Sequence, residues 1–188
     1  MKKSLSIDTP LGTIVFESDI SSIEKIPDLK MTLESFPIET IVYSSTLGYA
    51  IVKDNCYAIL LVAENLNNKT NIEFTATLLN DRLLWSGNNG EGLDSFECEN
   101  DEYVVQIGTE DGDYLGNRLN MPEITIDTWY LLQDQQQLKI SLTDYPHSQI
   151  SLHYILTWSD NPEINSICCW YAVDYPHNLL LKDLKSRL

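Results

Sequence analysis

The fold class is indicated by residues 49–63, which read YAIVKDNCYAILLVA. Two short apolar runs, Tyr49–Val52 and Cys56–Val62, flank Asp54-Asn55, two residue types that tolerate the positive φ angles of a tight hairpin. The longest dense apolar stretch, Cys56–Ala63, has the length of one buried strand and is much shorter than a membrane span. This stretch therefore predicts two antiparallel strands joined by a tight turn.

Short apolar runs closed by polar turn residues recur along the rest of the chain. Two more hairpins are expected, Leu5–Ile7 with Thr13–Phe16 and Phe74–Leu79 with Leu83–Ser86. Further strands are expected at Tyr103–Thr109, Trp129–Gln133, Leu138–Thr143, Ser151–Trp158 and Ile167–Val173. Because no linker separates these runs, they predict a single β-rich domain over residues 1–188, either an antiparallel sandwich or a curled sheet.

One or two short helices are expected beside the strands. Ser21-x-x-Glu24 has the form of a capping box, which predicts a short helix ending near Pro27 and then a strand. The Leu- and Lys-rich end, residues 178–188, predicts a terminal helix, and residues 86–92, which read SGNNGEG, predict a loop.

The charge balance limits the classes of partner. The chain carries 28 acidic and 12 basic residues, a formal net charge of −16. Nucleic-acid binding is not expected, because that affinity comes from clustered Lys and Arg, and an anionic membrane surface would repel the chain. The charge permits a cationic partner, metal ions or simply high solubility.

The N-terminal residues and the cysteines predict a cytoplasmic protein. Lys2 and Lys3 are not followed by an apolar run, so no signal peptide is expected. The cysteines contain no Cys-x-x-Cys pair and are expected to be reduced thiols. They are Cys56, Cys98, Cys168 and Cys169.

The acidic residues concentrate between Glu91 and Asp127. This segment holds eleven acidic residues and one basic residue, Arg118, so that it carries a net −10. Apolar and aromatic side chains lie among the acids, as at protein–protein contacts, although a solvated acidic face is the alternative interpretation. The residues predicted to bind a partner are Asp94, Glu97, Glu99, Asp101, Glu102, Tyr103, Glu110, Asp111, Asp113 and Tyr114.

One tetrapeptide occurs twice. Asp144-Tyr145-Pro146-His147 returns as Asp174-Tyr175-Pro176-His177, 30 residues later. Two carboxylates and two imidazoles could converge on a divalent metal ion, but turns in which Pro stiffens the exit from a strand are common. The sequence therefore predicts turns here and no metal site or cofactor.

No other motif predicts catalysis or metal binding. Asp111, Asp113 and Gly116 match the start of an EF-hand loop, but Leu115 and Pro122 stand where oxygen ligands are required. The expected structure here is an acidic turn with no flanking helix. Gly-x-Ser-x-Gly, Walker and Gly-x-Gly-x-x-Gly motifs are absent, and the buried run around Cys168-Cys169 predicts inert thiols.

These observations predict a small, acidic, intracellular binding protein without enzymatic activity. Its expected partner is a basic protein such as a toxin domain, which would make the chain an immunity protein that neutralises a bacterial toxin. One alternative is an enzyme or metal-binding module that uses the Asp-Tyr-Pro-His turns. Another is a DNA mimic whose acids imitate phosphates.

Overall fold

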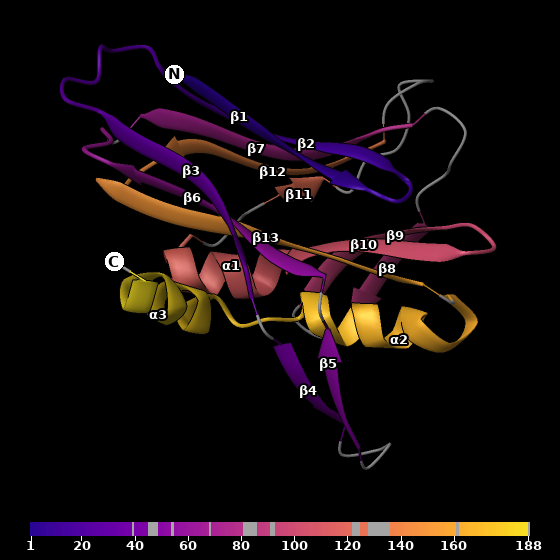
Figure 1. The fold of residues 1–188 in the computed structure, drawn as a ribbon. Coiled ribbons are helices and arrows are strands. Elements are labelled where there is room, and N and C mark those ends of the chain that lie inside the picture. Colours follow the sequence, from indigo (N-terminus) through magenta and orange to yellow (C-terminus); the bar gives the residue numbers. More distant parts are fainter. Residues whose placement is uncertain are drawn as a thin grey trace.

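Two antiparallel sheets pack face to face, and helices cover the outer face of one of them (Figure 1). The computed structural model describes residues 1–38, 40–44, 49–53, 55–67, 69–80, 86–90, 93–121, 125–127, 136–160 and 162–187. Within these ranges the expected mostly β sandwich with short helices is confirmed.

The first sheet has the strand order β1-β2-β7-β12-β11. Its strands are β1 (Lys2–Thr9), β2 (Gly12–Ser22), β7 (Thr70–Leu79), β12 (Gln136–Tyr145) and β11 (Thr125–Asp127). The expected first hairpin is confirmed, because Thr9 pairs with Gly12 and Leu5 with Phe16 in the β1–β2 register. The inner face of this sheet contributes Phe16 and Phe74 to the sandwich core.

The second sheet has the order β3-β6-β13-β10-β9-β8. Its strands are β3 (Lys30–Pro37), β6 (Cys56–Glu64), β13 (Gln149–Asp160), β10 (Tyr103–Glu110), β9 (Leu93–Glu99) and β8 (Ser86–Gly90). A separate two-stranded sheet pairs β4 (Thr40–Ser44) with β5 (Tyr49–Lys53).

The helices give the second sheet a covered outer face. They are α1 (Gly112–Leu119), α2 (Pro162–Val173) and α3 (His177–Arg187), and α2 packs across β10 and β13. A second core, which includes Ile155, Val173 and Leu180, lies between this sheet and α2 and α3. Strands β6 and β13 are therefore buried on both faces, and this explains their almost continuous apolar sequences.

The hairpin predicted from residues 49–63 is wrong. Strand β6 does form, but it pairs with β3 and β13, while β5 pairs with β4. A strand that is apolar on both faces is favoured in the middle of a sheet, where it pairs with one strand on each side. Here both of those paired strands are distant from β6 in the sequence. In the same way β7 pairs with β2 and β12, and residues 83–85 of its expected hairpin partner lie outside the described residues.

Four further local predictions are wrong. The expected helix near Pro27 does not form, because β2 runs to Ser22 and the strand β3 soon follows. The expected strand Ile167–Val173 is the second half of α2, because a short apolar run does not distinguish a strand from a buried helix. Part of the expected loop over residues 86–92 is β8, which pairs with β9 at the sheet edge. The expected acidic turn after Glu110 is α1.

The terminal helix is confirmed as α3, and the expected strand Trp129–Gln133 lies outside the described residues. None of the three helices, over the residues described, has both the length and the apolar character needed to cross a bilayer.

Candidate functional site

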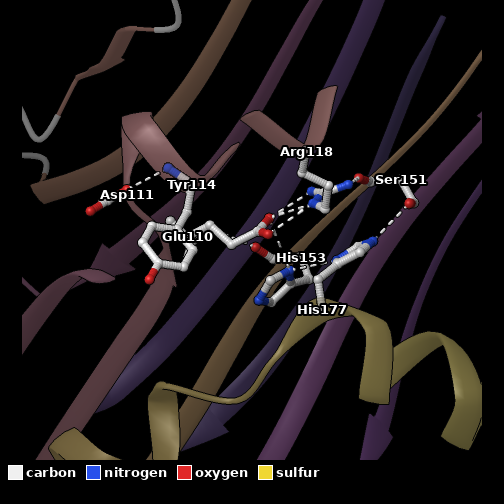
Figure 2. Close-up of polar contacts among 8 residues, drawn as sticks. Glu110, Asp111, Tyr114, Arg118, Ser151, His153 and His177 are labelled. Atoms are coloured by element: carbon white, nitrogen blue, oxygen red, sulfur yellow. Dashed lines mark hydrogen bonds and ion pairs between the residues drawn. The ribbon is translucent and has the colours of Figure 1, made fainter. Parts of the chain in front are cut away.

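The most concentrated polar cluster lies where β10, β13 and the start of α3 meet, on the helix-covered face of the second sheet. His153 from β13 and His177 from α3 place their Nδ1 atoms 2.8 Å apart (Figure 2). His177 belongs to the second copy of the repeated tetrapeptide. Its other ring nitrogen, Nε2, lies 2.8 Å from the hydroxyl oxygen of Ser151.

A carboxylate and a guanidinium complete the cluster. Glu110, the last residue of β10, places Oε2 3.9 Å from His153 Nδ1. Arg118 of α1 binds this carboxylate through two nitrogens, with Nε 2.8 Å from Oε1 and Nη2 2.6 Å from Oε2. Its third nitrogen, Nη1, donates to the Ser151 carbonyl at 3.0 Å. One arginine therefore connects α1, β10 and β13.

The local structure of α1 explains how Arg118 reaches this position. Asp111 caps the helix, because its side chain accepts a hydrogen bond from the Tyr114 amide at 2.8 Å. At the other end Asn120 adopts a left-handed conformation, with φ at 54°, and ends the helix. Arg118 lies in the last turn, where a cation also favours the helix dipole.

Burial keeps both imidazoles neutral. His153 is 2% exposed and His177 is 5% exposed. Burial, the neighbouring His177 and the Arg118 charge together hold the pKa of His153 well below its usual value. Burial and Arg118 lower the pKa of His177 to about 3. At neutral pH each ring therefore carries one N–H, and the rings form a hydrogen-bonded chain that ends at Ser151.

The cluster opens into a pocket of about 420 Å³. Glu110, Arg118, His153, Asp174, Tyr175 and His177 are among the residues that line it. Asp174 lines the pocket, and partial burial of its carboxyl raises the pKa of that group. The pocket thus places imidazole nitrogens and carboxylate oxygens where solvent has access to them.

The first copy of the tetrapeptide lies elsewhere. His147 Nε2 is 3.1 Å from the Leu119 carbonyl oxygen, and Asp144 is exposed, with its amide bonded to Asn71. Among the described residues, the one group of at least three His, Cys, Asp or Glu side chains with converging ligand atoms is Glu110, His153 and His177. The structure therefore does not bring the four residues of the repeat together.

The acidic residues predicted to bind a partner fall into two groups at opposite ends of the β9–β10 hairpin. One group surrounds the hairpin turn and consists of Glu99, Asp101, Glu102 and Tyr103, together with Glu97, which lies two residues before Glu99 in β9. Asp94, Glu110, Asp111, Asp113 and Tyr114 lie at the far end and on α1. Asp94 and Glu99 are five positions apart along β9, about 17 Å of extended chain, so the ten residues do not form one continuous patch.

Burial, and secondarily a neighbouring negative charge, raises the pKa of one carboxyl in each group. Burial and then the Asp111 charge raise the pKa of Asp94. Burial and then the Glu99 charge raise the pKa of Glu97. A cationic group beside either carboxylate would lower the free energy of the ionised carboxylate.

Aromatic side chains lie near the turn group. Tyr57 and Trp158 stack with ring centroids 5.4 Å apart, and both are half-buried. Tyr103 is also half-buried, and it pairs with Asp160 in the sheet while Trp158 pairs with the neighbouring Val105. Tyr57, Tyr103 and Trp158 therefore lie on the core-facing side of the second sheet, near the end that carries the acidic turn.

His153 and Ser151 were missed by sequence reasoning. A weak signal is present, since Ser151 and His153 alternate with the apolar Leu152 and Tyr154 in β13. The role of Arg118 could not be read from the sequence, because its contacts span three elements.

A search of protein-family models, curated proteins and solved structures finds no match to this chain.

Proposed function

We propose that this protein binds a basic protein partner through the β9–β10 turn, and that it acts as an intracellular immunity protein that neutralises a cationic bacterial toxin. The supporting observation is the combination of exposed Glu99, Asp101 and Glu102 with half-buried aromatic side chains at the same end of the second sheet. Protein–protein interfaces commonly combine charged residues at the rim with aromatic side chains that become buried on binding.

The turn group favours docking more than the α1 group does. In the described part of the chain, the carboxylates of Glu99, Asp101 and Glu102 make no ion pair. By contrast, Glu110 is bound by Arg118 and Asp111 caps α1. Acids that stabilise the fold are less available to a partner, so the turn is the stronger candidate surface.

The turn is also held in a defined shape. Asn100 accepts hydrogen bonds through Oδ1 from the amides of Glu102 and Tyr103, at 2.9 and 2.8 Å. The Asn100 amide donates to the Tyr103 carbonyl at 3.0 Å. A pre-organised turn loses little conformational entropy on binding, which favours affinity.

The net charge supports a cationic partner. At −16 the chain attracts basic proteins over a range set by ionic strength and repels nucleic acids. A DNA mimic would share this charge, and it would be distinguished by a partner that normally binds nucleic acid and is not a toxin. A toxin reading frame beside this gene would favour immunity.

The test compares two triple charge reversals. The turn variant is Glu99→Lys, Asp101→Lys and Glu102→Lys. The control variant reverses three exposed acids on β2, on the following loop and on β3, and so changes the net charge equally: Glu17→Lys, Glu24→Lys and Glu34→Lys. Wild type captures the partner from the native cell, and stopped-flow mixing then measures its association with all three proteins at several salt concentrations.

We expect the turn variant to lower the association rate at least tenfold and to flatten its salt dependence, while the control loses much less. Equal losses in both variants would mean that net charge alone attracts the partner. An unchanged rate in the turn variant would exclude this surface.

A further inference from the structure

We propose that Glu110, His153 and His177 form a binding site for a divalent transition-metal ion of the zinc class. Each residue offers one ligand atom, and these three atoms lie within 4.8 Å of one another. This site differs from the four-residue site considered for the repeated tetrapeptide and is independent of the proposed docking function. It also departs from the expectation that the chain binds no metal.

The spacing is close to what a metal needs. Ligand atoms around a tetrahedral zinc lie about 3.3 Å apart when the bonds are about 2.0–2.1 Å long. The two imidazole nitrogens are 2.8 Å apart and His153 Nδ1 is 3.9 Å from Glu110 Oε2. Binding therefore requires the imidazoles to separate by roughly 0.5 Å and the carboxylate to approach by a similar distance.

The neighbouring residues suit the three ligands. A metal-bound histidine usually donates its second ring N–H to a fixed acceptor, and Ser151 Oγ lies 2.8 Å from His177 Nε2. The glutamate is oriented by its two-nitrogen contact with Arg118, as ligating carboxylates commonly are. With the metal on both Nδ1 atoms, each ring carries its proton on Nε2, so the two neutral rings lose no proton.

The donor set selects the class of ion. Two imidazoles and one carboxylate suit zinc and other late first-row ions, whereas calcium and magnesium prefer oxygen ligands alone. Three protein ligands leave at least one coordination position, and the cluster borders the pocket of about 420 Å³. The Arg118 charge opposes a cation here, so the glutamate ligand is needed to offset it.

The experiment measures zinc binding to the EDTA-treated full chain by titration calorimetry and thermal melting. We expect one zinc per chain and a Tm rise of about 5–10 °C when free zinc exceeds its dissociation constant 100-fold. Cobalt substitution should give the visible absorption of a low-symmetry, four- or five-coordinate site, and calcium should leave the Tm unchanged.

Variants locate the ion. His177→Gln and Glu110→Gln should each weaken zinc binding at least tenfold, and His147→Gln, the third histidine, should leave it unchanged. Circular dichroism shows whether each variant is folded, and the cobalt spectrum of wild type tests the site even if one variant unfolds. No stoichiometric zinc binding to wild type, or full binding by His177→Gln, would show that the cluster is only a hydrogen-bonded anchor for α3.

Discussion

The strongest stability prediction concerns Arg118→Met. Methionine keeps the apolar body of the side chain and removes the guanidinium, which binds Glu110 through two nitrogens and the Ser151 carbonyl through the third. The Arg118 side chain is 24% exposed and that of Glu110 is 15% exposed, so solvent screens this pair only partly. Its loss leaves a largely buried carboxylate beside the His153 ring.

The expected cost is about 3 kcal/mol in the free energy of unfolding, since hydrogen bonds to charged groups contribute roughly 1.5–3 kcal/mol and a stranded charge adds to the loss. The chain offers a matched control in Lys139, whose Nζ lies 2.6 Å from Glu73 Oε1 on the first sheet. Glu73 is 54% exposed, so Lys139→Met should cost at most about 1 kcal/mol.

Urea denaturation followed by tryptophan fluorescence measures both values, and an unchanged m-value shows that the unfolded states are comparable. The Arg118→Met protein should also melt roughly 10 °C below wild type. Adding Glu110→Gln should restore part of the loss, because the stranded charge is then gone. If Arg118→Met costs no more than Lys139→Met, the arginine does not hold α1 to the second sheet.

Three further outcomes are expected. Tyr154→Phe should lower the free energy of unfolding by about 1–2 kcal/mol, measured by urea denaturation. The Tyr154 hydroxyl donates across the sandwich to two backbone carbonyls, at 2.8 and 3.1 Å, and both would lose this partner. Gly108→Ala should cost about 1–3 kcal/mol in the same assay, because a Cβ there would lie 2.8 Å from Val173 of α2; a neutral result would mean that α2 shifts freely. Iodoacetamide at pH 8 should modify Cys98 only after unfolding, as mapped by mass spectrometry. The Cys98 residue is 1% exposed, and burial together with the charges of Glu99 and Glu97 raises the pKa of its thiol to about 11. Fast labelling of the folded protein would contradict this.

The two proposed sites lie in different parts of one architecture. The ligands of the proposed metal site come from β10, β13 and α3, whereas the acidic turn connects β9 to β10 (Figure 1). No residue of the turn group contributes a ligand atom to the cluster. The two proposals can therefore fail separately, and neither experiment depends on the other.

Local sequence determined much of the fold. Short apolar runs closed by turn residues predicted strands β6, β10 and β13, and the runs Leu5–Ile7 and Thr13–Phe16 predicted the β1–β2 hairpin. These features depend on neighbours a few residues apart, so periodicity and turn chemistry are sufficient to reveal them. Composition alone also determined the net charge of −16.

Tertiary structure decided which strands pair and which polar residues meet. The apolar run of β6 is the same whether its partner is β5 or β13, and only burial of both faces between two layers places it at the centre of a sheet. Glu110, His153 and His177 are separated by 43 and 24 residues, and neither the acidic segment around Glu110 nor the repeat around His177 indicates that they meet at His153. They converge because β10 and β13 are adjacent strands and α3 folds back over them. Local patterns carry no information on such long-range contacts, since the free energy that selects them comes from burying the layers against one another.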